Sequence, residues 1–179
     1  MERPPDDITP PELARLTVER YITEGEVIDP PLAPGELLAG QAGAFVTLRT
    51  DDGLLRGCIG TVAPTCDTIA EEIIRNAISA ATRDPRFAPV TVEELPRLTY
   101  GVDLLSPAEA ASGPEDLDPS RYGVIIETLD GTRRGLLLPS IQGINTADEQ
   151  WRAVHQKAGI RLGTPVKVER FSVTRFGKD

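Results

Sequence analysis

Aromatic residues, cysteine and histidine are all scarce in this chain of 179 residues. Aromatic side chains make up only 4% of the residues, so we do not expect the stacking platforms that hold single-stranded nucleic acid. The two cysteines are too few for a disulfide scaffold. Together with the single histidine, they are also too few to provide the usual four ligands of a zinc or iron–sulfur site. We therefore expect no metal and no cofactor.

Long apolar runs and a basic surplus are also missing. No apolar stretch approaches the roughly 18 residues of a membrane span, and the acidic, proline-rich N-terminus does not have the pattern of a secretory signal. The chain has 28 acidic and 19 basic residues, a net charge of −9 and a pI of about 4.7. This balance disfavours nucleic acid or an anionic membrane as a partner. We expect a cytoplasmic protein.

Enough hydrophobic residues are present, 40%, for a sizeable core. We expect a flexible arm over residues 1–8 and a single domain over residues 9–179. Three Thr-x-x-Glu capping boxes predict helix starts. They begin at Thr9, Thr68 and Thr146, with helices that run to about Tyr21, Arg83 and Ala158.

Two Asp-Gly pairs predict β-hairpins, at Asp52-Gly53 and at Asp130-Gly131. Alternating or apolar segments predict strands over 43–49, 54–59, 98–105, 122–129, 135–139 and 166–176. The segment 106–119 is rich in Pro, Ala, Ser and acidic residues, which favours a boundary loop. Hairpins interleaved with helices predict an α+β fold with a mainly antiparallel sheet.

The segment Leu55–Gly60, LRGCIG, is the densest candidate for chemistry. Because side chains alternate along a strand, Arg56 and Cys58 share one face. A guanidinium beside a thiol stabilises the thiolate, and Gly57 and Gly60 leave room for a ligand or another backbone. The alternative is a bulged strand end that contains a small buried cysteine.

The segment from Arg83 to Phe87 is the second candidate. Arg86 is suited to bind a carboxylate or a phosphate at a cleft. Asp84, which precedes a proline, is a normal turn former, so a structural turn with ion pairs is the alternative that the pattern alone favours.

Two further residues have a reactive side chain. His155 shares a helix face with Trp151, and a Cys58–His155 dyad would combine a nucleophile with a base, although a packed or surface histidine fits the pattern better. Cys66 is a candidate resolving thiol for Cys58.

These segments together resemble one family. LRGCIG at 55–60, AATRDPRF at 80–87, PEDLDPSRYGV at 114–124, GLLLP at 135–139 and QKAGI at 156–160 are similar to the AMMECR domain family. Within it, they resemble protein A of the prokaryotic AmmeMemoRadiSam system. The resemblance covers roughly residues 9–176.

The resemblance implies an α+β domain with a larger and a smaller lobe, and a cleft between them that the LRGCIG region lines. Its motifs fall on Leu55, Arg56, Gly57, Cys58, Ile59 and Gly60, and on Asp84, Arg86 and Phe87. The system's name implies two partners: a Memo-like protein, similar to non-haem-iron extradiol dioxygenases, and a radical SAM protein. The family has no established reaction.

Three functions remain open at this point. The chain is either a module that binds a small acidic ligand or a partner segment, or an enzyme that uses Cys58 as an activated thiolate nucleophile. A weaker third possibility is a redox-sensing pair of Cys58 and Cys66.

Overall fold

Capping boxes begin the three long helices where the sequence predicts them. The computed structural model describes residues 3–177. Helix α1 (Pro10–Glu24) follows Thr9, α3 (Ile69–Thr82) follows Thr68, and α4 (Ala147–Ala158) follows Thr146. In each box the glutamate accepts a hydrogen bond from the backbone of the N-cap residue. The three predicted helix starts are confirmed.

The chain divides into two compact units. The first comprises 1–105 and 174–179, and the second is the continuous segment 106–173. Each unit has its own cluster of buried hydrophobic residues.

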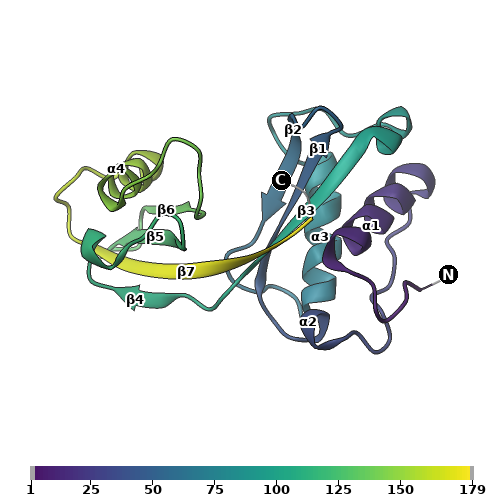
Figure 1. Cartoon of the computed structure of the whole chain (residues 1–179), viewed down its shortest axis with the longest axis horizontal. Coiled ribbons are helices and arrows are strands. Elements are labelled where there is room, and N and C mark those ends of the chain that lie inside the picture. The colour runs from purple at the N-terminus through teal and green to yellow at the C-terminus, as the bar shows by residue number, and fades with distance from the viewer. Residues whose placement is uncertain (1–2, 178–179) are drawn as a thin grey trace. The chain divides into compact units, whose positions relative to one another are not determined.

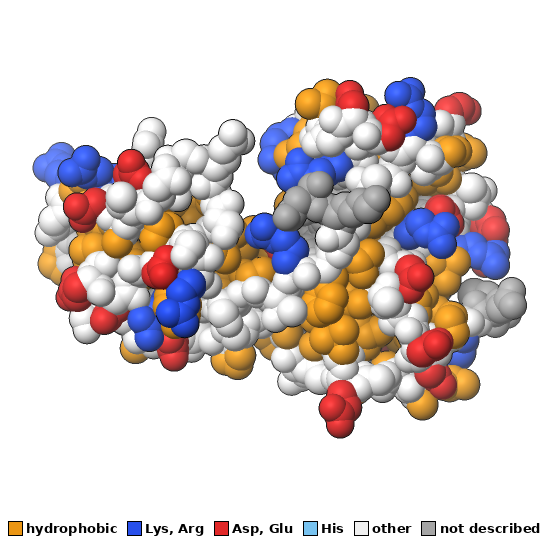
Figure 2. Space-filling model, viewed as in Figure 1, with side chains coloured by type: hydrophobic (Ala, Val, Ile, Leu, Met, Phe, Trp, Pro, Cys, Tyr) orange, Lys and Arg blue, Asp and Glu red, His pale blue; other side chains and the backbone are white. Residues whose placement is uncertain are grey.

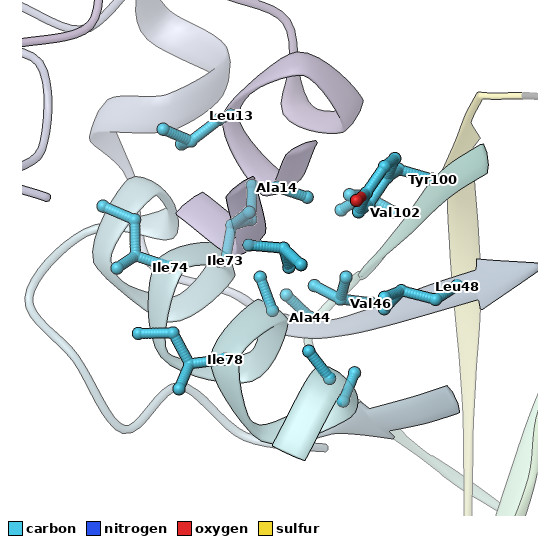
Figure 3. Close-up of a cluster of buried hydrophobic side chains, with 14 of the residues drawn as sticks. Leu13, Ala14, Ala44, Val46, Leu48, Ile73, Ile74, Ile78, Tyr100 and Val102 are labelled. Carbon is cyan, nitrogen blue, oxygen red and sulfur yellow. The ribbon is translucent and has the colours of Figure 1, made fainter. Parts of the chain in front are cut away.

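The first unit is a three-stranded antiparallel sheet with helices on one face. Strand β1 (Gly43–Thr50) lies between β2 (Leu55–Gly60) and β3 (Leu98–Leu105). Helices α1 and α3 pack beside these strands (Figure 1). The inward residues of β1, which are Ala44, Val46 and Leu48, meet the core residues of both helices (Figure 3). Because side chains alternate along a strand, Thr47 and its neighbours on β1 point to the other face of the sheet.

Two short elements complete this unit, α2 (Glu36–Ala39) and the 3₁₀ helix η1 (Val92–Arg97). The end of β7 (Val166–Phe176) also returns here, where Arg175 Nε donates to Asp103 Oδ1 at 2.9 Å. The flexible arm predicted over residues 1–8 lies partly outside the described residues. Within them, Asp6 Oδ1 accepts a hydrogen bond from Ala33 N, and Arg3 forms an ion pair with Asp29.

The second unit is antiparallel as well. Strand β5 (Tyr122–Thr128) pairs with β6 (Arg134–Leu137) and with β7, and β7 pairs with the short β4 (Glu109–Ala111). Helix α4 covers β5 and β6 (Figure 1). The segment 106–119 is not irregular throughout, because it contains β4 and the 3₁₀ helix η2 (Pro114–Asp116). The α+β fold with antiparallel sheet is confirmed, whereas a cleft between lobes stays a prediction.

Acidic and basic side chains are interspersed on both units, on the face that Figure 2 shows. No helix among residues 3–177 is long and apolar enough to cross a membrane.

Candidate functional site

Strand β2 presents Arg56 and Cys58 on the face of the sheet that points away from α3. Gly57, between them, is buried, and a methyl group at this position would overlap with the carbonyl oxygen of Ala80 in α3. The glycine thus lets the last turns of α3 lie directly on β2. Because side chains alternate along the strand, Arg56 and Cys58 point to the opposite side.

Asp84 joins this strand to the segment that follows α3. Its side chain is only 2% exposed, and Oδ2 accepts hydrogen bonds from Cys58 N at 2.9 Å and from Arg86 Nη2 at 2.7 Å. Oδ1 accepts from Arg86 Nε at 2.9 Å. The hydrogen bonds from Arg86, together with that from Cys58, outweigh burial and lower the pKa of Asp84 well below its usual range. Asp84 is therefore a carboxylate that fixes Arg86 in a bidentate pair.

Arg56 is held in the same way by a residue that sequence reasoning missed. Its Nε donates to Glu94 Oε1 at 2.6 Å, and its Nη2 donates to Glu94 Oε2 at 3.0 Å. The Arg56 side chain is 14% exposed. The Arg56 hydrogen bonds lower the pKa of Glu94. The signal for Glu94 was another capping box, since Thr91 starts η1 and donates its backbone N–H to the Glu94 carboxylate at 2.8 Å.

The ring of Phe87 lies near both guanidinium groups. Its centroid is 5.8 Å from Cζ of Arg56 and 5.5 Å from Cζ of Arg86. Both distances are within the range of cation–π contacts. The structure therefore brings Arg56, Cys58, Asp84, Arg86 and Phe87 together within the first unit, and we call this group the Arg86 surface.

The thiol of Cys58 has a hydroxyl as its polar neighbour. Thr47, directly opposite in the β1–β2 register, donates a hydrogen bond from Oγ1 to Cys58 Sγ at 3.2 Å. Arg86 Nη2 donates to the Cys58 carbonyl oxygen at 3.4 Å. Within residues 3–177, no imidazole or carboxylate is hydrogen-bonded to the sulfur. Neither cysteine forms a disulfide.

The other residues of the LRGCIG motif contact the protein itself. Ile59 packs against the core of the first unit, and a methyl group at Gly60 would overlap with the ring of Phe45. Leu55 pairs with Arg49 next to an irregularity of the ladder. Ligand contacts of these three residues stay predictions.

Glu72 organises the loop between β2 and α3, a role that its position near a helix start does not predict. The residue is 1% exposed, and its carboxylate accepts hydrogen bonds from Thr65 N at 2.7 Å, Cys66 N at 2.9 Å and Thr61 Oγ1 at 2.5 Å. Burial raises the pKa of Glu72, but these hydrogen bonds outweigh it and the net effect lowers the pKa. The Cys66 backbone is thereby tied to α3.

His155 belongs to the second unit and is 1% exposed. Its Nδ1 lies 2.9 Å from the carbonyl oxygen of Trp151, and the two rings are 4.4 Å apart. A carbonyl only accepts hydrogen bonds, so Nδ1 carries a proton. The imidazole is thus packed on its own helix in the second unit, whereas Cys58 belongs to the first.

Residues 3–177 contain no group of three or more His, Cys, Asp or Glu side chains arranged to hold a metal ion.

Comparisons with known proteins agree on one family. The profile of the AMMECR1 family matches residues 11–177. A Thermotoga maritima protein is 50% identical over 161 residues, which are 89% of this chain and 91% of that protein. A Clostridium acetobutylicum protein is 45% identical over 92% of this chain, but this chain spans only 35% of that longer protein.

A solved structure supports the same conclusion. The crystal structure of an uncharacterized protein from Pyrococcus horikoshii superposes with a TM-score of 0.84 at 33% sequence identity, and the match covers 95% of this chain and 90% of that one. The sequence match and the shared fold confirm the resemblance, and the chain belongs to the AMMECR1 family.

Proposed function

We propose that this chain is a binding module and that the Arg86 surface is where it binds. The bound group is a carboxylate, carried either by a small acidic ligand or by an acidic segment of a partner protein. The partners we propose are a Memo-like protein and a radical SAM protein, as the family resemblance suggests.

The observation that carries this proposal is the state of Arg86. Its side chain is 53% exposed, yet Asp84 holds Nε and Nη2 in place. Within residues 3–177, Nη1 makes no hydrogen bond. A guanidinium that is held through Nε and Nη2 and has Nη1 available loses little side-chain freedom when Nη1 binds a carboxylate.

The environment of Cys58 favours binding over nucleophilic catalysis. A nucleophilic thiol needs a nearby base or an uncompensated positive charge. Both nearby guanidinium groups are already paired, Arg56 with Glu94 and Arg86 with Asp84. The neighbour of the sulfur is a threonine hydroxyl, which is not a base at neutral pH.

The length of a relative supports a partner role. In the Clostridium acetobutylicum protein, the region that matches this chain is 35% of the whole. A domain of this kind is thus joined to a longer chain in that organism, as expected for a module that works beside another protein.

Calorimetric titration with the purified Memo-like and radical SAM proteins of the same genome tests the proposal. We expect saturable binding by the wild type and by Cys58→Ser, and binding at least tenfold weaker by Arg86→Lys, which keeps the charge but loses the planar fork. Arg97→Lys is the matched control, since Arg97 forms an exposed ion pair with Asp51. The proposal fails if neither protein binds, or if Arg86→Lys binds as the wild type does.

The second candidate is an enzyme with Cys58 as its thiolate nucleophile. The hydrogen bond from Thr47 Oγ1 to the sulfur favours it, because an O–H donor stabilises a thiolate. The pH dependence of Cys58 alkylation, in a Cys66→Ala background, separates the two candidates. An apparent pKa clearly below the ordinary value of about 8.5, restored by Arg56→Ala, would support the enzyme. An inert thiol, or one with an ordinary titration, would support the binding module.

A further inference from the structure

A second concave site lies in the first unit, along the flank of α3. A pocket of about 360 Å³ is bounded by the end of α1, the loop around residues 27–30 and one side of α3. Figure 3 shows Ile74 and Ile78, two of its lining residues, on the side of α3 turned away from β1 and β3. The pocket is therefore separate from the Arg86 surface, which lies beyond β2.

The wall of this pocket is apolar. Its apolar lining residues are Tyr21, Val27, Ile28, Pro30, Ile74 and Ile78. Val27 is 54% exposed although it is a large hydrophobic residue. An apolar wall of this kind gains free energy when an alkyl or aryl chain displaces water from it.

One edge of the pocket is a polar stripe on α3. Glu71, Arg75, Ser79 and Arg83 follow one another at intervals of four residues, so they share a helix face. At a rise of about 1.5 Å per residue, this stripe is about 18 Å long. The site is thus elongated, with one apolar side and one polar edge.

The charge of this edge is positive. The Glu71 carboxylate already accepts hydrogen bonds from Asp67 N and Thr68 N, each at 3.1 Å. Arg75 donates to the hydroxyl of Thr65 at 3.3 Å, which leaves its charge uncompensated. Among residues 3–177, the Arg83 guanidinium has no hydrogen-bond or ion-pair partner, and only the backbone N–H of Arg83 is bonded, to Ser79 O. Within residues 3–177, the guanidinium groups of Arg75 and Arg83 are therefore not paired with a carboxylate, although the chain has a net charge of −9.

We propose that this pocket binds a small amphipathic carboxylate, with its hydrocarbon chain against Ile74 and Ile78 and its carboxylate at Arg83, while Arg75 adds positive charge to the same edge. The volume is at the lower end of the range for small-molecule sites, about 300–1,000 Å³, which fits a single short chain rather than a large cofactor. A guanidinium binds a carboxylate through two parallel hydrogen bonds, and the apolar wall selects against small hydrophilic acids.

Decanoate is the probe for this site, used below the concentration at which it forms micelles. With ¹³C-labelled isoleucine methyl groups, we expect saturable shifts at Ile74 and Ile78 and none at Ile126 and Ile160 in the core of the second unit. Decyltrimethylammonium has the same chain and the opposite charge. We expect it to bind at least tenfold more weakly.

The variant Arg83→Glu removes one cation without touching the core, because Arg83 is exposed. We expect at least tenfold weaker decanoate binding, and an unchanged affinity in the control Arg161→Glu, which makes the same charge change at an exposed residue outside the pocket. The proposal is wrong if decanoate gives no saturable shift, if the cationic probe binds equally well, or if Arg83→Glu binds as the wild type does. Since the pocket and the Arg86 surface share no residue, failure of the decanoate experiment leaves the binding-module proposal unaffected.

Discussion

Asp84 is the residue on which the geometry of the Arg86 surface depends. It is 2% exposed and accepts hydrogen bonds from the backbone of β2 and from Arg86. We expect Asp84→Asn to lower the free energy of unfolding by about 2 kcal/mol at pH 7, because an amide breaks the ion pair and accepts with only one oxygen. Urea denaturation followed by circular dichroism measures the change.

The pH dependence of that difference has a definite sign. The pKa of Asp84 is lowered in the folded protein, so its stabilising contribution is present above its ordinary unfolded pKa, about 3.9. The contribution is lost as the pH falls through the lower folded value. The gap between wild type and Asp84→Asn should therefore shrink as the pH falls below about 4. A gap that stays constant as the pH falls well below about 4 would contradict the assigned ion pair.

Glu72 and Glu71 are neighbours with different roles, which makes them a matched pair. Glu72 is buried and holds Thr65 and Cys66, whereas Glu71 completes a capping box, a position where glutamine also serves. We expect Glu72→Gln to cost about 2 kcal/mol and to speed hydrogen exchange at the amides of Thr65 and Cys66. Glu71→Gln should change both quantities little. Equal effects of the two substitutions would contradict the role of Glu72 in holding the loop between β2 and α3.

At the residue scale, relations between side chains that are close in the sequence could be predicted. Hydrogen-bond partners that are far apart in the sequence could not. Arg56 and Cys58 share a face because side chains alternate along a strand, and their spacing of two residues is enough to predict this. Glu94, in contrast, is 38 residues from Arg56, and Asp84 reaches the backbone of Cys58 across 26 residues. Only the packing of α3 on β2 brings these segments together.

At the scale of elements, the contact between α3 and β2 depends on Gly57. We expect Gly57→Ala to destabilise the protein by about 2 kcal/mol or more, because a methyl group there overlaps with the Ala80 carbonyl. Gly101→Ala in β3 is the control, since the nearest atom to its added carbon is Phe176 O at 3.7 Å, an ordinary contact. Thermal melting compares the two variants. Equal melting temperatures would show that α3 does not rest on Gly57.

The long elements were predictable because each has a strong local signal. The capping boxes mark α1, α3 and α4, and the Asp-Gly turns at Gly53 and Gly131 have the positive φ that such hairpins need. The short α2, η1, β4 and η2 were not predicted. Each has only three to six residues, too few for a periodic pattern, and none adjoins an Asp-Gly turn of the kind that marks the equally short β2 and β6. Tertiary contacts therefore decide whether these elements form.

At the scale of the whole molecule, two separate hydrophobic cores should open separately. Val154 is fully buried in the second unit and Leu48 in the first. We expect Val154→Ala to speed hydrogen exchange in β5 more than in β1, and Leu48→Ala to do the reverse. If each substitution speeds exchange equally in both strands, the two units unfold as one.

The measurement that tests the central claim most directly is hydrogen exchange of the chain with and without its bound partner, the Memo-like or the radical SAM protein. If the Arg86 surface is the binding site, the partner will slow exchange in the segments 56–60 and 84–87, while the segment 71–83 at the α3 pocket stays unchanged. If a partner binds and the segments 56–60 and 84–87 exchange as they do in the free chain, the site lies elsewhere and the account is wrong.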